Sequence, residues 1–177
     1  MRATGLLVAL VLLTAPVPRA AQGVLAQADH LVYATPDLQL GIDEIKAPRL
    51  TTWVAKGKAL DKFAADAKAH GVDLGAVIPG SRTRPDGVVL SWTYTDPRVG
   101  LADRLVPYLI DRGASPHPSA TAAKGVTLLS LRAEHPDADR VQAMLKQLGL
   151  DLAVTRGPKP SLIATFNSPK GRVQIRS

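Results

Sequence analysis

The chain contains the same short segment twice. Residues 71–74 are Gly-Val-Asp-Leu, and residues 149–152, 78 positions later, are Gly-Leu-Asp-Leu. The same offset aligns Phe63 with Val141, in two stretches whose apolar residues recur at helical spacing. Self-similarity at a fixed period is the sequence signature of a repeated structural unit. We therefore predict two copies of one unit, each with a helix that ends at a glycine.

The elements around the two helices follow the same order. Each predicted helix comes after a β-rich strand and is followed by three strand candidates, which gives a βαβββ unit. We assign one unit to residues 47–111 and the other to residues 125–177, joined by a linker over residues 112–124 that lacks periodicity. A strand and a helix over residues 28–46, with Pro36 at the first helical position, precede them as an incomplete β-α unit. The predicted fold class is α+β.

Residues 1–21 have the pattern of a secretory signal peptide. Arg2 precedes an uncharged apolar run over residues 5–17, and small residues follow at Ala20 and Ala21. The run is shorter than the roughly 20 residues that span a bilayer, so a retained membrane anchor is the less favoured alternative. We predict export to the periplasm or the medium, with cleavage after Ala20, Ala21 or Ala26 and no membrane association afterwards.

Charge and composition argue against several classes of function. Removal of Arg2 and Arg19 with the signal segment lowers the formal net charge of +7 to about +5. The basic residues are scattered and aromatic residues are few, so nucleic acid is not an expected partner. The chain has no cysteine, which excludes disulfides, thiolate zinc sites and a cysteine nucleophile. It also shows no nucleophile elbow and no phosphate-binding loop. A pocket for a small anionic molecule is compatible with this composition.

Several segments of the chain resemble glyoxalase-like domain proteins of the vicinal oxygen chelate (VOC) superfamily. They are residues 29–38 (Asp-His-Leu-Val-Tyr-Ala-Thr-Pro-Asp-Leu), residues 80–87 (Gly-Ser-Arg-Thr-Arg-Pro-Asp-Gly) with Trp92, residues 106–111 and residues 115–118. The resemblance covers nearly the whole chain after the signal segment, and the order of the motifs is its most specific feature. It implies paired βαβββ modules that form a curved mixed β-sheet or partial barrel around a cleft. Against that pattern the first module is truncated, because residues 44–48 lead directly into the next unit.

Two arginines near a Pro-Asp-Gly turn are the main candidates for ligand contact. Arg82 and Arg84 could hold a carboxylate or phosphate through forked hydrogen bonds, with Asp86 orienting one of them. Trp92 follows on the next strand and could line a cleft. The alternative is a turn whose arginines pair with Asp86 and solvent, and a Trp92 that belongs to the core. We expect a small anionic or oxygen-rich molecule as the ligand.

His30 lies where the superfamily has a metal ligand on its first strand. The resemblance therefore implies a site for one divalent metal ion, Zn, Fe, Ni or Mn. A catalytic metal normally takes three protein ligands, and the sequence offers Asp111 as the candidate partner, with Glu134 and His135 as further candidates at no diagnostic spacing. The alternative is a structural His30. His117, in the proline-rich linker, is expected to be exposed.

The resemblance implies a small-molecule cleft and, for an enzyme, metal-assisted lyase, isomerase or dioxygenase chemistry. The alternative function is a non-catalytic binding or structural protein that keeps the fold after losing part of the first module. Strand edges left open by that loss also predict a homodimer, in which a second chain covers them.

Overall fold

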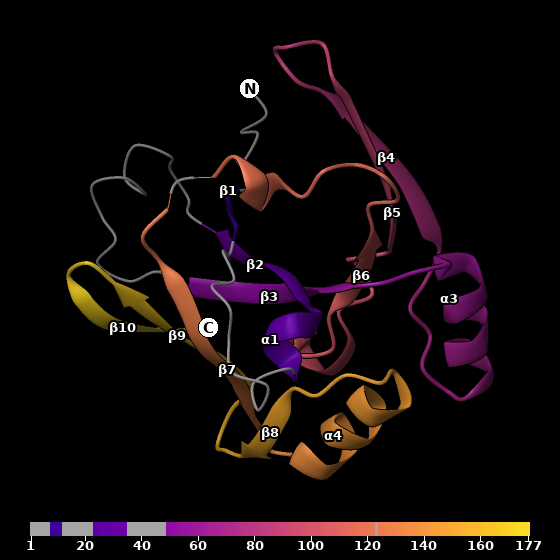
Figure 1. Ribbon diagram of the computed structural model, residues 1–177. Coiled ribbons are helices and arrows are strands. Elements are labelled where there is room, and N and C mark those ends of the chain that lie inside the picture. Colours follow the sequence, from indigo (N-terminus) through magenta and orange to yellow (C-terminus); the bar gives the residue numbers. More distant parts are fainter. Residues whose placement is uncertain (1–7, 12–22, 35–48, 123) are drawn as a thin grey trace, which may run out of the picture.

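The computed structural model describes residues 8–11, 23–34, 49–122 and 124–177 (Figure 1). The strands are β1 (Val8–Val11), β2 (Ala28–Ala34), β3 (Arg49–Lys56), β4 (Val77–Thr83), β5 (Val89–Thr95), β6 (Tyr108–Asp111), β7 (Thr127–His135), β8 (Ala153–Arg156), β9 (Ser161–Ser168) and β10 (Gly171–Arg176). The helices are α1 (Val24–Gln27), α3 (Leu60–Ala69) and α4 (Ala138–Gln147), with short 3-10 helices η2 (Leu101–Arg104) and η3 (Pro118–Ala120). The α+β class predicted from the sequence is confirmed.

Strand β3 joins the two halves of one mixed sheet. The sheet has the order β4-β5-β6-β3-β10-β9-β7-β8, with β2 on β3 and β1 on β2. One edge of β3 pairs with β2, and the other edge is shared by β6 and β10 at its two ends. In Figure 1, β4, β5, β6 and α3 lie on one side of β3, and β7 to β10 with α4 lie on the other. The described strands follow an open path and do not close into a barrel.

The repeated sequence segment forms the same helix end twice. Gly71 follows α3 with a φ of 89°, and Gly149 follows α4 with a φ of 67°, a backbone region that favours glycine. The amide after Gly71 donates to Ala67 O at 2.9 Å, and the amide after Gly149 donates to Leu145 O at 2.8 Å. Both are Schellman-type caps, so the sequence repeat corresponds to a repeat in the backbone.

The two units share their element order but not their strand pairing. In the first, β3 pairs in parallel with β6, the fourth strand of the unit. In the second, β7 lies between β8, which is parallel, and β9, which is antiparallel. The difference follows from β9, whose residues Ser161–Ala164 are all buried. A strand buried on both faces suits a central position, and β9 has β7 on one edge and β10 on the other.

One hydrophobic core serves both halves of the molecule. Trp53 of β3 and Leu145 of α4 are fully buried in the same cluster. Trp53 donates from Nε1 to Leu105 O at 2.8 Å, which satisfies the indole in the interior. At the surface, Gln27 of α1 accepts a hydrogen bond from Asp151 N at 2.8 Å. Packing therefore joins β3 to the second unit, and a hydrogen bond joins α1 to it.

The predicted Pro-Asp-Gly turn closes the hairpin of β4 and β5. Gly87 N donates to Arg84 O at 2.9 Å, and Arg84 N donates to Val88 O at 2.8 Å, so the turn begins at Arg84. Gly80 and Arg82 lie in β4 instead, paired with β5. In Figure 1 this hairpin extends well beyond the rest of the sheet.

The N-terminal predictions fall mostly outside the described residues. The signal segment has only Val8–Val11 described, which form β1 on β2, and the helix expected after Pro36 lies in the undescribed range 35–48. Within the described part of the chain, no helix has the length and apolar character needed to cross a membrane. Export stays a prediction.

Candidate functional site

A cavity of ≈ 530 Å³ lies between β2, the β4–β5 hairpin and β6. We call it the His30 cavity. Its size falls within the range of small-molecule sites, and it combines aromatic, apolar and charged groups. Its lining residues are His30, Gly80, Ser81, Arg82, Leu90, Trp92, Tyr94, Pro97, Tyr108, Ile110, Arg112 and Pro118.

A bulge in β2 makes two neighbouring side chains meet beside this cavity. Ala28 pairs with Ala55 and His30 with Val54, so Asp29 is an extra residue in the strand. Successive side chains of a regular strand point to opposite faces, but a bulge changes their directions. Asp29 Oδ1 consequently accepts a hydrogen bond from His30 Nδ1 at 2.7 Å.

Asp29 is buried and accepts four hydrogen bonds. Besides His30, the donors are Arg112 Nη2 to Oδ1 at 2.7 Å, Arg112 Nε to Oδ2 at 3.0 Å and His117 Nε2 to Oδ2 at 3.2 Å. Burial alone would raise the pKa of Asp29, but the hydrogen bonds from His30 and Arg112, together with the charge of Arg112, hold that pKa well below its ordinary value. The carboxylate is ionised at neutral pH, and its acceptor positions are filled.

This ionised carboxylate fixes the tautomer of His30. A carboxylate only accepts hydrogen bonds, so the neutral ring of His30 carries its proton on Nδ1 and its lone pair on Nε2. His30 is buried and lines the cavity. Among the hydrogen bonds of the described residues, none involves Nε2. Asp29 therefore holds His30 with an unprotonated nitrogen on the side of the ring away from Asp29.

His117 has the opposite tautomer. Its Nε2 donates to Asp29, and its Nδ1 accepts from the N–H and O–H of Ser119 at 3.2 and 2.7 Å. Burial lowers the pKa of His117, and although Asp29 opposes this, Arg112 adds to it. The neutral ring satisfies both contacts, so His117 is a structural part of the site. The prediction of an exposed His117 is wrong, because residues 112–122 fold back onto β2 and His117 bonds to Asp29.

Two tyrosines form an aromatic wall of the cavity. Tyr108 meets His30 edge-on, with 6.5 Å between ring centroids, and Tyr94 meets Tyr108 edge-on at 6.3 Å. Burial, and then the negative charge of Asp29, raise the pKa of Tyr108 to about 12. The phenol is thus protonated at neutral pH and keeps a hydrogen to donate.

The predicted ligand residues Arg82 and Trp92 both line the His30 cavity. Arg82 is exposed on β4, and no carboxylate of the described residues lies within ion-pair distance of it. Trp92 lies against Gly80 across the hairpin, where a β-carbon on residue 80 would be 2.5 Å from the indole nitrogen. Arg84 lines a smaller neighbouring cavity of ≈ 200 Å³, together with Arg82 and His117.

The carboxylates of Asp86 and Asp111 are bonded to residues outside the His30 cavity. Asp86 pairs with Arg84 at 2.7 Å in the turn. Asp111 accepts from Lys58 Nζ at 2.9 Å, Ala59 N at 3.2 Å and Gly113 N at 2.9 Å. Asp86 thus has the pairing that the sequence left open as the alternative, and Asp111 stabilises the loop before α3.

The described residues do not fit a three-ligand metal centre at His30. No group of three or more potential ligands exists among them. Asp29, the nearest carboxylate, has its acceptor positions filled, and Arg112 adds a positive charge where a divalent cation would bind. Glu134 is held by Arg132 at 2.8 Å, and His135 bonds to Asp103 at 3.0 Å. The metal ion stays a prediction from the resemblance.

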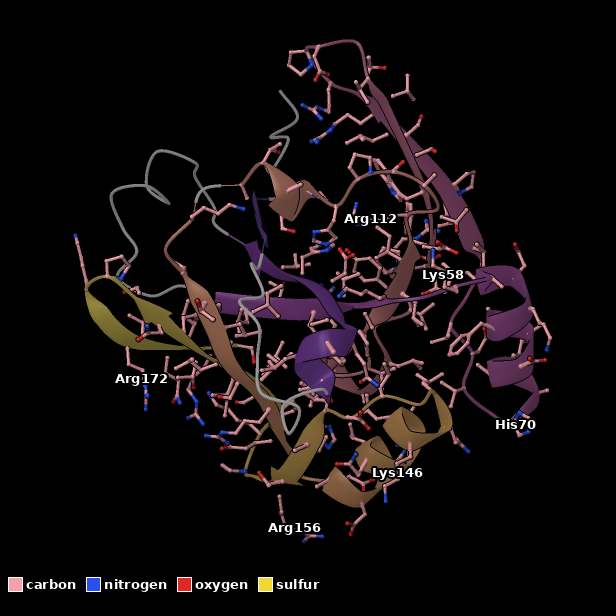
Figure 2. All side chains as sticks on the ribbon, viewed as in Figure 1. Lys58, His70, Arg112, Lys146, Arg156 and Arg172 are labelled. Carbon is pink, nitrogen blue, oxygen red and sulfur yellow. The ribbon has the colours of Figure 1, made fainter. Side chains whose placement is uncertain are left out.

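Sequence reasoning missed the charged residues behind His30. Asp29 and Arg112 are 83 positions apart, and only the pairing of β2 and β6 on either side of β3 brings them together. Figure 2 shows Arg112 in the interior of the molecule beside β6, whereas Arg156 and Arg172 project outward from β8 and β10. The one signal available was the Asp-His pair itself, an acidic residue next to a histidine in a strand otherwise apolar.

Comparison with known proteins adds one finding. The family model described as a glyoxalase-like domain matches residues 40–149, more than half of the chain. No curated protein and no solved structure matches the chain. The matched range contains Arg82, Trp92, Tyr108 and Arg112, but it starts after His30.

Proposed function

The chain belongs to the glyoxalase-like domain family, and we propose that it binds a small, oxygen-rich carboxylate in the His30 cavity. The observation that carries the proposal is the charge arrangement of the cavity. Arg82 reaches it without a carboxylate partner among the described residues, while the nearby Arg112 is held by Asp29. A guanidinium presents a planar pair of donors that matches a carboxylate.

The other lining groups suit the oxygen atoms of such a ligand. Tyr94 and Tyr108 supply hydroxyl groups, His30 supplies an acceptor nitrogen, and Trp92 supplies an apolar surface. A site with one charged anchor and several polar groups binds one small polar molecule in a defined orientation. A divalent cation in the cavity would be repelled by the Arg82 guanidinium, and the one nearby carboxylate, Asp29, is already paired with Arg112. We therefore propose that the ligand binds without a metal.

The proposal is tested by ligand-induced thermal stabilisation of EDTA-treated protein. The probes are pyruvate, 2-oxobutyrate, lactate and malonate. A ligand at 100 times its Kd stabilises a protein by about 2.7 kcal/mol, which for a chain of this length raises Tm by about 5–10 °C. We expect at least one probe to give such a rise and Arg82→Ala to abolish it.

The matched control is Arg172→Ala, since Arg172 is an exposed arginine on the outward side of β10 (Figure 2). It should keep the full rise in Tm. The proposal fails if no probe stabilises the wild type, or if Arg82→Ala responds as strongly as Arg172→Ala.

A second candidate function is non-catalytic, in which the cavity binds a ligand but the protein catalyses no reaction. The observation that favours it is the absence of a three-ligand set around His30 among the described residues. Binding that leaves every probe chemically unchanged would support it, and the experiment of the next subsection decides the point.

A further inference from the structure

The tautomer of His30 is one that can accept a proton from a bound ligand. We infer that Asp29 holds His30 as a metal-independent base, whose Nε2 accepts a proton from the carbon next to the keto group of a 2-oxo carboxylate in the His30 cavity. The inference rests on the proposed function for the placement of the ligand. It adds a reaction, a substrate class and a role for His30.

The first support is the hydrogen-bond network around Asp29. A histidine acts as a base when one ring nitrogen is held protonated by a partner and the other has its lone pair toward the substrate. His30 Nδ1 donates to Asp29 at 2.7 Å, and Asp29 is itself held by the two donors of Arg112. The ring therefore has a fixed tautomer, and the bulge in β2 fixes its direction.

The second support is the contrast between the two histidines that contact Asp29. His117 uses both ring nitrogens in bonds to Asp29 and Ser119. His30 uses only Nδ1 among the described residues, and it is His30 that lines the larger cavity. Among the described residues, His30 therefore differs from His117 in lining the His30 cavity with one ring nitrogen that has no hydrogen-bond partner.

The third support is the charge around the lone pair. The positively charged Arg82 and Arg112 line the same cavity as His30. Positive charge opposes a divalent cation but stabilises an anion that forms during a reaction. The same positive charge would oppose protonation of Nε2, and the Asp29 carboxylate compensates the charge that the ring gains with the proton.

The reaction balances without an oxidant or a cofactor. The C–H bond breaks, and the proton forms a bond to His30 Nε2. The C–H electron pair becomes a carbon–carbon double bond while the carbonyl pair moves onto the keto oxygen, which gives an enolate. The His30 imidazolium is paired with the Asp29 carboxylate, and Arg82 holds the substrate carboxylate. Return of a proton from Nε2 to the same carbon restores the keto acid and the neutral ring.

The test is exchange of carbon-bound hydrogen for deuterium, followed by proton NMR. EDTA-treated full chain is incubated in D₂O with 2-oxobutyrate or with pyruvate, and the signal of the protons next to the keto group is recorded over time. We expect exchange by the wild type at a rate at least about 100-fold above that of His30→Gln, the lower end of the usual contribution of a general base. His70→Gln changes a histidine at the exposed end of α3, and it should exchange at the wild-type rate.

Two results overturn the inference. One is a wild-type rate no higher than that of His30→Gln. The other is exchange that occurs only after Zn²⁺ or Mn²⁺ is added. Thermal stabilisation by the same acids separates this failure from that of the proposed function. Stabilisation that Arg82→Ala abolishes, without exchange, refutes the base and leaves the binding site. Absence of both stabilisation and exchange refutes the base and the binding site together.

A measurement on the wild type avoids any dependence on a variant that does not fold. Long-range proton–nitrogen NMR assigns the ring tautomer of each histidine directly. We expect the proton of neutral His30 on Nδ1 and that of neutral His117 on Nε2. A His30 ring protonated on Nε2 has no lone pair on that nitrogen and overturns the inference.

Discussion

Replacement of Asp29 by asparagine tests the network behind His30 through stability. The Asp29 side chain is 2% exposed and that of Arg112 is 17% exposed, and two short hydrogen bonds join them. Removal of one partner of a buried ion pair costs about 3–5 kcal/mol. Arg112 keeps some contact with solvent and the asparagine oxygen still accepts a bond, so we expect a loss of about 3 kcal/mol for Asp29→Asn. Urea denaturation with a slope near 2 kcal/mol/M would show this as a midpoint lower by about 1.5 M.

The matched control is Asp96→Asn. Asp96 makes a forked pair with Arg98, but the Arg98 side chain is 82% exposed, and solvent screens such pairs. Its midpoint should stay at the wild-type value. Equal midpoints for Asp29→Asn and Asp96→Asn would refute the view that burial makes the Asp29 network important.

Comparison of the wild type with Asp29→Asn also tests how the stability of the fold depends on pH. The pKa of Asp29 is depressed in the folded chain, so Asp29 stabilises the fold above its unfolded pKa of about 4. That stability is lost as the pH falls below this value toward the folded pKa. The wild type should therefore lose more stability than Asp29→Asn between pH 4 and pH 2. Parallel stability curves over that range would contradict the depressed pKa.

Three further predictions concern the core and the cavity wall. Trp53→Phe removes the bond to Leu105 O and should lower the free energy of unfolding by about 2 kcal/mol or more in urea; an unchanged midpoint would show that the bond is not made. Tyr108, with its pKa near 12, should destabilise the fold as the pH rises above 10, the unfolded value, and Tyr108→Phe should flatten that loss in alkaline denaturation. Gly80→Ala should displace the Trp92 indole and shift the fluorescence emission of that residue in a Trp53→Phe background; an unshifted spectrum would place the indole elsewhere.

The repeat and the helix ends were predictable from the sequence because they depend on local rules. Gly71 and Gly149 each adopt the positive φ of a helix cap, and the apolar spacing before them marks the buried faces of α3 and α4. Strand pairing depends on residues far apart in the chain. The parallel pair β3–β6 and the central position of β9 follow from which apolar faces meet, and no local pattern encodes that.

The candidate site was predictable only where one short segment supplied it. Arg82 and Trp92 were identified from the hairpin sequence, and they face one cavity because β4 and β5 pair directly. His30 was identified from the resemblance, but its partners were not. Asp29 meets His30 through a bulge, and Arg112 and His117 reach Asp29 from a segment that lacks periodicity. Bulges and long-range ion pairs have no local pattern that reveals them.

The central claim, that the His30 cavity holds a small carboxylate without a metal, is tested most directly by a crystal structure of the full chain with 2-oxobutyrate and Zn²⁺ both present. We predict the carboxylate of the ligand on the Arg82 guanidinium, its keto end toward His30 Nε2, and no zinc within bonding distance of His30. Zinc bound to His30 Nε2, or a ligand carboxylate bound away from Arg82, would contradict the account.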